Sequence, residues 1–403
     1  MTSRMFHGSF TQQEPIPEEA IEAAVAVMRS GRLHRYNLAS GERGETALLE
    51  QEFADWQGSK YCLAMASGGQ AIQIGLRAAG VGAGGKVLTN AFTLAPVPGA
   101  IAAVGGLPVL VEIDENLRLD LDDLDRKAAE SGARTLLLSH MRGHLCDMEA
   151  VMAIAARRGF QVIEDCAHTM GARWKGIKSG NFGVAACFST QTYKHMNSGE
   201  GGFLTSDDPD LMARATVLSG SYMFYDRHGA GPDEKHFEAA RYQMPNQSAR
   251  MDALRAAILR PQLRLLEKNI ARWNTLYNTV ADGLSKSPAI VVPRRPQEED
   301  MVGSSIQFRV PALDAAGCHA LIRRCGDRGV QLKWFGDREP SGFTSDHASW
   351  RYFNAQTLPK TDRVLSTLFD MRLPLTFSPQ DCALIADIIV ENVGAQEAAG
   401  TLR

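Results

Sequence analysis

The segment T-L-L-L-S at Thr135–Ser139, followed by F-Q-V-I at residues 160–163, decides the fold class of this chain. Both are short apolar runs of strand length, and between them Asp147 can cap a helix that ends at Gly159. This order predicts the βαβ unit of a mostly parallel sheet, in which ligands collect at the carboxyl ends of the strands. Asp165 follows the second strand at such an end. Further strands are expected at residues 87–89, 108–111 and 185–188.

Length and composition favour a soluble enzyme of two domains. The 403 residues are too many for one compact core, and the net charge of -3 provides no basic footprint for nucleic acid. The polar N-terminus lacks the apolar core of a signal peptide, and prolines and glycines interrupt the longest uncharged stretch, so we expect no membrane span. Seven scattered cysteines, none in a C-x-x-C pair, favour a reducing cytoplasm over a disulfide framework.

The C-terminal part of the chain has a different pattern. Apolar residues recur at helical spacing over residues 254–277, interrupted only by Pro261, which we expect to start or kink a helix. Strands are expected at residues 289–293 and 306–310, and helices near residues 319–328 and 378–391. We therefore predict a large domain with an N-terminal arm at residues 1–265 and a smaller C-terminal α/β domain at residues 266–403.

Lys194 ends the segment F-S-T-Q-T-Y-K and precedes G-E-G-G at residues 199–202. A lysine amine can form a Schiff base with the aldehyde of pyridoxal phosphate (PLP), and an acid such as Asp165 can keep the pyridine nitrogen protonated, so that the ring accepts electrons. Neither residue is specific alone, because most lysines are solvated and an aspartate after a strand is usually a cap or a turn. Their combination suggests a PLP enzyme.

Three further segments can complete a cofactor site. Residues 67–71, S-G-G-Q-A, precede an apolar helix and expose backbone N–H groups where a phosphate binds well, although a plain glycine turn has equal weight. Phe92 follows a strand end and can stack on a ring, although a core phenylalanine is the commoner explanation. Ser189 can offer a hydroxyl to the phosphate or simply form a turn. We expect no metal site at His140 and His144, because they fall in a loop.

Together these segments resemble the DegT/DnrJ/EryC1/StrS family of PLP aminotransferases, most of which aminate keto sugars or cyclitols. The resemblance covers nearly the whole chain and implies a fold-type I, aspartate aminotransferase-like PLP transferase fold. Its motifs are F-A-D-W-Q-G (residues 53–58), S-G (67–68), N-A-F (90–92), G-L-P-V (106–109), D-M (147–148), E-D-C-A-H (164–168), the segment ending at Lys194, G-E-G-G (199–202), R-M (250–251), A-A (256–257) and Q-L (262–263).

The resemblance assigns a role to each residue at a matching position. Lys194 is the Schiff-base lysine and shuttles the proton between the substrate carbon and the cofactor carbon. Asp165 pairs with the pyridinium nitrogen, and His168 lies near the phenolic oxygen. Ala167 packs beneath the ring and Phe92 stacks on its other face. The phosphate contacts are assigned to Ser67, Gly68, Gly69 and Ser189, with Gln191 lining the same region.

Three positions depart from the family pattern. The family usually has threonine where this chain has Gly69, which removes one hydroxyl donor from the phosphate loop. It often has asparagine, supplied by the neighbouring subunit, where this chain has Ser248, with Asn246 two residues earlier. Residues 219–247 match no family pattern, and we expect them to determine substrate specificity.

The resemblance therefore implies a homodimer with shared active sites that transfers an amino group from an amino acid donor, glutamate or glutamine, to a keto sugar or cyclitol. One alternative is a PLP-dependent sugar dehydratase of the same family, which has histidine in place of the intact Lys194. A second is a non-catalytic regulatory protein, against which the retained Lys194 and Asp165 argue. A cysteine desulfurase needs a mobile reactive cysteine, whereas Cys318 and Cys325 fall in a predicted helix.

Overall fold

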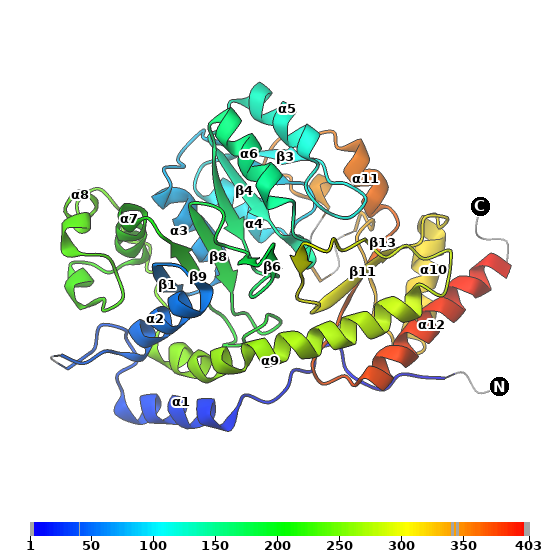
Figure 1. Cartoon of the computed structure of the whole chain (residues 1–403), viewed down its shortest axis with the longest axis horizontal. Coiled ribbons are helices and arrows are strands. Elements are labelled where there is room, and N and C mark those ends of the chain that lie inside the picture. Colours follow the sequence, from blue (N-terminus) through cyan, green and yellow to red (C-terminus); the bar gives the residue numbers. More distant parts are fainter. Residues whose placement is uncertain (1–3, 40, 340–341, 344–345, 399–403) are drawn as a thin grey trace.

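A computed structural model describes residues 4–39, 41–339, 342–343 and 346–398 of the chain. At its centre lies a seven-stranded sheet with the strand order β1-β9-β8-β5-β4-β2-β3. β9 runs antiparallel to both neighbours, and the other pairs are parallel. The predicted α/β fold with a mostly parallel sheet is confirmed (Figure 1). The strands are β1 (Tyr61–Met65), β2 (Lys86–Asn90), β3 (Leu107–Val111), β4 (Thr135–Ser139), β5 (Gln161–Asp165), β8 (Ala185–Ser189) and β9 (Gly202–Ser206).

Helices cover both faces of this sheet, because successive side chains of a strand point to opposite faces. In β4, Leu136 and Leu138 belong to a core cluster with α2, α5, α6 and α9, whereas Leu137 belongs to a second cluster with α3, α4 and α7. The helices of this unit are α1 (Glu18–Ser30), α2 (Glu45–Gln57), α3 (Gly68–Ala78), α4 (Pro96–Ala103), α5 (Leu121–Ser131), α6 (Met148–Arg158), α7 (Pro209–Ser219) and α8 (Phe237–Ala240).

The predicted βαβ unit is present with its expected caps. Asp147 Oδ1 accepts a hydrogen bond from the N–H of Ala150 at 3.0 Å, and α6 ends at Gly159, whose φ of 72° suits glycine. The second strand extends further than predicted, so that Asp165 is the last residue of β5 and does not follow it. The carboxylate nevertheless lies at the expected end of the sheet.

The long helix α9 (Ala253–Leu284) joins the two parts of the molecule (Figure 1). Its 32 residues include Pro261, so no helix starts at this proline, and the alternative expectation of a kink stays a prediction. The side chains of Leu266 and Trp273 belong to the core of the seven-stranded sheet, and those of Leu276 and Val280 belong to the C-terminal core. The predicted domain border at residues 265/266 thus lies inside a continuous helix, and the change of core follows a few residues later.

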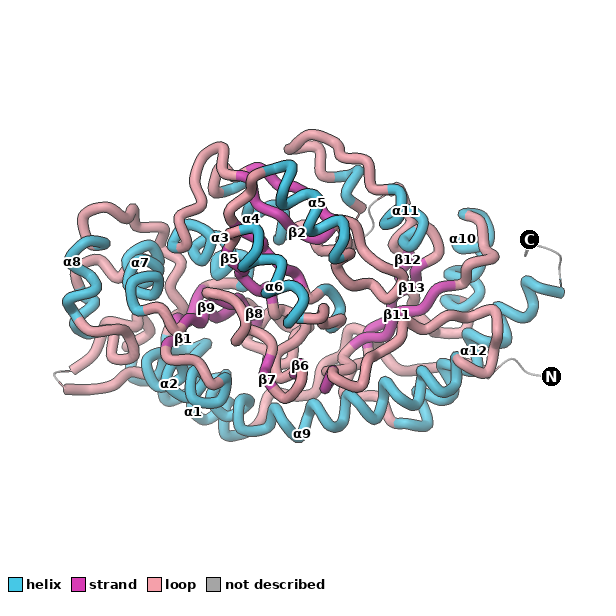
Figure 2. Tube along the Cα trace, turned by 45° about the horizontal axis from the view of Figure 1, so that its top comes forward, coloured by secondary structure: helices cyan, strands magenta, loops and turns pink. Residues whose placement is uncertain are grey.

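The C-terminal part has its own antiparallel sheet of order β11-β13-β12 (Figure 2). Phe6 and Phe10 near the N-terminus pack against its core beside Phe377. The strand predicted at residues 289–293 is wrong, because only Val291 forms an isolated bridge there. The elements are β11 (Ser305–Arg309), α10 (Ala315–Gly326), β12 (Lys333–Trp334), α11 (Pro359–Leu365), β13 (Leu368–Arg372) and α12 (Pro379–Ala398).

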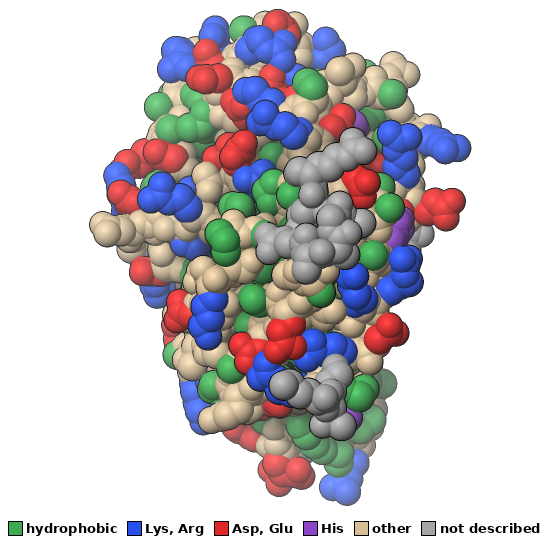
Figure 3. Space-filling view, turned by 90° about the vertical axis from the view of Figure 1, so that its right-hand side faces the viewer, with side chains coloured by type: hydrophobic (Ala, Val, Ile, Leu, Met, Phe, Trp, Pro, Cys, Tyr) green, Lys and Arg blue, Asp and Glu red, His purple; other side chains and the backbone are tan. Residues whose placement is uncertain are grey.

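Short elements complete the described chain. They are β6 (Arg173–Trp174), β7 (Ile177–Lys178) and β10 (Glu299–Asp300), which form a small sheet, and the 3-10 turns η1 (Met141–Gly143), η2 (Phe224–Arg227), η3 (Glu234–His236) and η4 (His347–Ser349). Within the described ranges, no helix combines the length and apolarity needed to cross a bilayer. Acidic and basic side chains are interspersed over the face shown in Figure 3 and do not gather by sign there.

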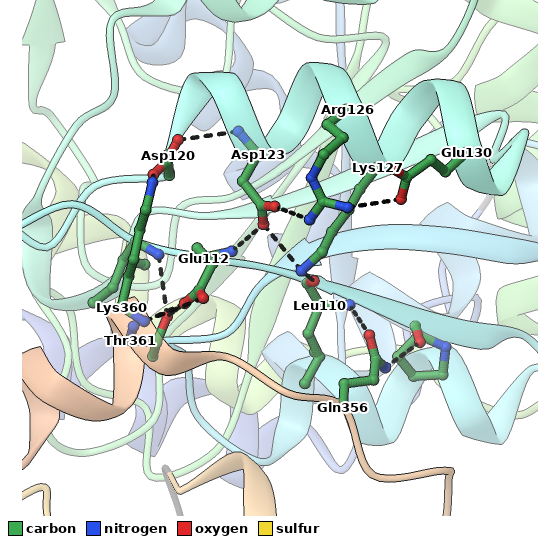
Figure 4. Close-up of polar contacts among 12 residues, drawn as sticks. Leu110, Glu112, Asp120, Asp123, Arg126, Lys127, Glu130, Gln356, Lys360 and Thr361 are labelled. Carbon is green, nitrogen blue, oxygen red and sulfur yellow. Dashed lines mark hydrogen bonds and ion pairs between the residues drawn. The ribbon is translucent and has the colours of Figure 1, made fainter.

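The chain just before α11 and at its start lies beside β3, the edge strand of the large sheet (Figure 4). The Gln356 amide donates to the carbonyl of Pro108 and accepts from the N–H of Leu110, both at 2.9 Å, as a neighbouring strand would do. At the start of α11, the N–H and hydroxyl of Thr361 donate to the Glu112 carboxylate at 2.8 and 2.6 Å. These contacts anchor the chain around the start of α11 to β3 and to the residue that follows it.

Candidate active site

The carboxyl ends of the parallel strands converge on one cavity of about 530 Å³. Ser139 ends β4, Asp165 ends β5 and Ser189 ends β8, while Ser67 follows β1. The cavity is therefore where a mostly parallel sheet is expected to bind its ligand. Its lining comprises Ser67, Gly68, Gly69, Ile72, Thr93, Leu94, Ala95, Pro96, Val97, Ser139, Met141, Arg142, Asp165, Ala167, His168, Ser189, Gln191, Tyr193, Lys194, Glu200, Gly342, Phe343 and Arg372.

The carboxylate of Asp165 is buried and held in a fixed orientation. Its Oδ2 accepts from the hydroxyl of Ser139 at 2.9 Å, and that hydroxyl accepts from Thr93 at 2.8 Å. Its Oδ1 accepts from the N–H of Ala167 at 3.2 Å. Burial raises the pKa of Asp165 although the Lys194 amine lowers it. A cationic group of a ligand beside this carboxylate would offset the cost of its burial.

The amine of Lys194 lies 2.7 Å from Nε2 of His168. Burial, followed by the positive charge of Arg142, lowers the pKa of Lys194 to about 7, although Asp165 raises it. A large share of the amine is thus neutral near pH 7, and the neutral amine is the form that attacks an aldehyde. The structure brings the predicted lysine, aspartate and histidine together in one cavity.

His168 presents a defined nitrogen to the cavity. Its Nδ1 accepts from the backbone N–H of Arg142 at 3.2 Å, so in the neutral ring the proton is on Nε2. Burial and the positive charges of Lys194 and Arg142 hold the pKa of His168 well below its usual value, which keeps the ring neutral. His168 therefore offers a hydrogen-bond donor to an oxygen placed beside Lys194.

A phosphate-sized anion can bind at the N-terminus of α3. The Ser67 hydroxyl caps this helix by accepting from the N–H of Gln70 at 3.1 Å, and the first helical N–H groups have no acceptor within the helix. A Cβ atom at Gly68 would lie 2.8 Å from that of Ser189, so this position requires glycine. At Gly69 the nearest atom would be 3.8 Å away, so the family's threonine would fit here.

Phe92 does not occupy its predicted place. Its side chain is fully buried, packs edge-to-face on Phe335 with 5.0 Å between ring centroids, and is not part of the cavity lining. The turn after β2, in which Asn90 Nδ2 donates to the carbonyl of Phe92 at 2.8 Å, directs this ring into the core. Leu94, two residues later, lines the cavity instead. The prediction that Phe92 stacks on the cofactor must therefore be corrected, because its ring does not face the cavity.

Asn246 and Ser248 do not line the cavity of their own chain. The N–H of Ser248 donates to Asn246 Oδ1 at 2.8 Å in an exposed loop, so neither residue reaches Lys194 of the same chain. No part of residues 219–247 lines this cavity either. Within the described chain, that segment is thus not a lid over its own site.

His140 and His144 bind different partners. His140 Nε2 lies 3.1 Å from a Glu164 oxygen, and His144 Nε2 lies 2.8 Å from the Gln307 amide oxygen. His140, Glu164 and Cys166 bring potential metal-ligand atoms within 4.8 Å of one another. The Glu164 carboxylate, however, already accepts from the N–H groups of Gly180, Phe182 and Gly183, so it serves to fix the loop behind Asp165.

Sequence reasoning missed the residues that close the cavity from the other side. Arg142 has a φ of 56° and forms a 2.7 Å ion pair with Asp370 of β13. The Arg372 guanidinium lies 3.8 Å from the centroid of the Tyr193 ring. Phe343 also lines the cavity. No short motif signals these residues, because they meet only when the two units pack together.

Comparisons with known proteins agree with this geometry. The sequence profile of the DegT/DnrJ/EryC1/StrS aminotransferase family matches residues 15–389. The chain is 31% identical over 276 residues to the L-glutamine:scyllo-inosose aminotransferase of Streptomyces griseus, covering 67% of this chain and 63% of that protein. It is 33% identical over 289 residues to the erythromycin biosynthesis sensory transduction protein EryC1 of Saccharopolyspora erythraea, covering 71% and 74%.

Structural comparison gives the same result. The crystal structure of DesV from S. venezuelae matches with a TM-score of 0.79 and 26% identity, covering 93% of this chain and 94% of that chain. This chain therefore belongs to the DegT/DnrJ/EryC1/StrS aminotransferase family. It matches less than two thirds of the length of the Streptomyces griseus enzyme.

Proposed function

We propose that this protein is a PLP-dependent aminotransferase that moves an amino group from glutamate or glutamine to the ketone of a sugar or cyclitol. The observation that carries the proposal is the meeting of Lys194, Asp165 and His168 in one cavity with the N-terminus of α3. The amine and the buried carboxylate are the groups that PLP enzymes use at the aldehyde and at the ring nitrogen, and the neutral donor and the anion site suit its phenolic oxygen and its phosphate.

The residues fit this cofactor in charge and in space. The N–H groups at the start of α3, with Ser67 and Ser189, would hold the phosphate, and the glycine at position 68 leaves room for its approach. Asp165 would face the ring nitrogen. Its buried carboxylate accepts hydrogen bonds from Ser139 and Ala167 but forms no ion pair with a described residue. When bound, PLP supplies an electron sink for the carbanion that forms at the substrate carbon.

The chain's own residues would then do the following. Lys194 would hold the aldehyde and afterwards, as a free amine, move the proton between the two carbons, for which a pKa of about 7 is well placed. His168 Nε2 would donate to the phenolic oxygen and fix the ring, because its other nitrogen is held by the backbone of Arg142. Ser139 would keep the Asp165 carboxylate aimed at the ring nitrogen.

The two alternative functions, a sugar dehydratase and a regulatory protein, have less support than the aminotransferase. A dehydratase of this family has histidine where this chain has Lys194, and the structure places the Lys194 amine in the cavity. A regulatory role is favoured by the names of two relatives, a pleiotropic regulatory protein and the sensory transduction protein EryC1. A protein that only binds PLP gains nothing from a catalytic amine with a lowered pKa, so the enzyme remains the better proposal.

We further propose that the protein is a homodimer whose partner subunit contributes Asn246 or Ser248 to the cofactor phosphate. Four large apolar side chains in the same segment of the chain are exposed, with exposed fractions of 52% for Tyr222, 55% for Met223, 42% for Phe224 and 77% for Tyr242. Exposed apolar side chains of this size suit a subunit interface. All seven cysteines are free and buried, which suits a reducing cytoplasm.

Complementation tests the shared site. A heterodimer of a Lys194→Ala chain and a chain with Asn246→Ala and Ser248→Ala should recover part of the activity, because one hybrid site keeps both its lysine and its phosphate ligands. Verified heterodimers without activity would refute the shared site.

An acceptor screen tests the aminotransferase assignment. The PLP-loaded protein is first incubated with L-glutamine, freed of the donor, and then offered neutral keto sugars and keto cyclitols, with Lys194→Ala as the control. We expect the absorbance of the aldehyde form to return with one class of ketone, and the amine to appear in that product. A protein that binds PLP but does not accept an amino group from glutamine or glutamate would contradict the proposal.

A further inference from the structure

The cavity contains one guanidinium whose charge no described residue balances. Arg372 ends β13 and lines the cavity together with Lys194. Among the residues that the structure describes, its guanidinium forms neither an ion pair nor a hydrogen bond, and it lies 3.8 Å from the centroid of the Tyr193 ring. A guanidinium that faces a cavity without a partner is available to a ligand that supplies the negative charge.

The geometry of β13 directs Arg372 to the reaction centre. Side chains alternate along a strand, so Asp370 and Arg372 share one face while Phe369 and Met371 pack into the small core on the other. Asp370 is on the cavity side, because it pairs with Arg142 of the cavity wall. Tyr193, on which Arg372 is stacked, immediately precedes Lys194.

Two other charged groups of the cavity, Arg142 and Asp165, are already held by neighbouring residues. The ion pair of Arg142 and Asp370 is buried, and the second oxygen of Asp370 accepts from the Gln307 amide at 2.8 Å. Asp165 accepts from Ser139 and Ala167 at the end of the large sheet. Glu200 is exposed. Arg372 is thus the cation that remains for an incoming anion.

We propose that Arg372 is a specificity-determining residue that binds a carboxylate of the substrate beside the carbon that exchanges its amino group. This inference rests on the proposed function. A guanidinium binds a carboxylate through two parallel N–H···O bonds, and stacking on Tyr193 holds its plane while leaving the N–H edge free. The amino donor always brings a carboxylate next to its amine, and an acidic acceptor can bring another.

Three variants test the proposal in the PLP-loaded protein. Arg372→Gln removes the charge, Arg372→Lys keeps it without the planar fork, and Arg363→Gln removes an arginine from an ion pair at 3.4 Å on the exposed face of α11. Titration calorimetry with glutarate, a dicarboxylate without an amine, measures carboxylate binding. We expect about 10- to 100-fold weaker binding in Arg372→Gln, a partial loss in Arg372→Lys and none in Arg363→Gln.

The half-reaction with L-glutamine then identifies the source of the carboxylate. If Arg372 binds the donor, the concentration needed for half-maximal rate rises by the same factor in Arg372→Gln, while the limiting rate falls less. If glutarate binding is weakened and the glutamine half-reaction is unchanged, the carboxylate belongs to the acceptor.

Two outcomes would overturn the proposal. One is that Arg372→Gln changes neither glutarate binding nor the glutamine half-reaction. The other is an equal loss of PLP affinity, which would place the cofactor phosphate on Arg372. A wild-type protein that does not react with any amino donor would refute the proposed function, and the glutarate titration would still decide on Arg372.

Discussion

The residues on the large-domain side of the cavity and those on its small-domain side are brought into place by different features of the fold. On the large-domain side, Asp165, Ser189 and Lys194 lie in short segments at or near the ends of strands of one sheet. On the other side, Arg142 meets Asp370, and Arg372 meets Tyr193, between units whose sequences are far apart. Groups placed by a strand end can be found from local sequence, whereas groups placed by domain packing cannot.

The difference predicts that the two sides respond differently to substitution. The groups on the large-domain side should control cofactor binding and the chemical step. Those on the small-domain side should control substrate affinity and the contact between the two units. The following substitutions separate these effects.

The largest effect is expected for the ion pair between the two sides. Asp370→Asn leaves the buried Arg142 guanidinium without its partner and should lower the free energy of unfolding by about 3–5 kcal/mol. The matched control is Asp387→Asn, whose partner Arg4 is 52% exposed and whose loss should cost at most about 1 kcal/mol. Urea unfolding measures both, and equal losses would mean that the buried pair does not join the two units.

On the large-domain side, Asp165→Asn keeps the shape of the side chain and removes its charge. The ring nitrogen should then lose its proton, and the donor half-reaction should slow by about 10²-fold or more, with the cofactor still bound. Asp55→Asn, on the exposed face of α2, is the control and should not change the rate. A rate in Asp165→Asn equal to that of the wild type would show that another acid faces the nitrogen.

The pH dependence of cofactor capture tests whether charges on the small-domain side of the cavity lower the pKa of Lys194 on the large-domain side. Because burial and Arg142 lower the pKa of Lys194 to about 7 from its usual 10.5, the neutral amine is present at lower pH. The rate at which cofactor-free protein captures PLP should rise through about pH 7 and level off above it. Arg372→Gln should move the midpoint to higher pH, because it removes a cation that favours the neutral amine. A rate that still rises at pH 10 in the wild type would contradict this explanation.

The smallest effect is expected at the phosphate loop. Gly69→Thr restores a hydroxyl for which the loop has room, and it should tighten PLP binding by about 0.5–1.5 kcal/mol in an equilibrium titration. Gly68→Ala is the matched control, because its Cβ atom would collide with that of Ser189 and should weaken binding. Equal affinities in the two variants would place the phosphate elsewhere.

Particular residues show which parts of the fold and of the site could be predicted from the sequence. The parallel sheet, the cap of α6 and the pairing of Lys194 with Asp165 were predicted from local patterns, since strand ends and helix caps are set by neighbouring residues, whereas His168 was predicted from the family resemblance. Phe92 was misassigned because the turn after β2 directs its ring into the core and away from the cavity. The alternation of apolar residues in the sequence does not reveal such a turn. Arg142 and Arg372 were missed because their partners lie on other elements.

Residues 219–247 show the same limit. They were expected to determine specificity, and they do not line the cavity of their own chain. His228 in this segment instead joins a buried cluster in which Arg35 binds Glu50 at 2.7 and 2.9 Å. In the dimer that we propose, Asn246 of this segment, or Ser248 just after it, reaches the cavity of the partner subunit.

Mapping the lysine that carries PLP tests the central claim most directly. Borohydride reduction of the yellow, PLP-loaded protein followed by peptide mass spectrometry should place the pyridoxyl group on Lys194, and Lys194→Ala should not retain it. Lys178 is the informative competitor, because burial lowers its pKa to about 8 and it lies beside Trp56, outside the cavity. A pyridoxyl group on Lys178, or full labelling of the Lys194→Ala protein, would contradict the account.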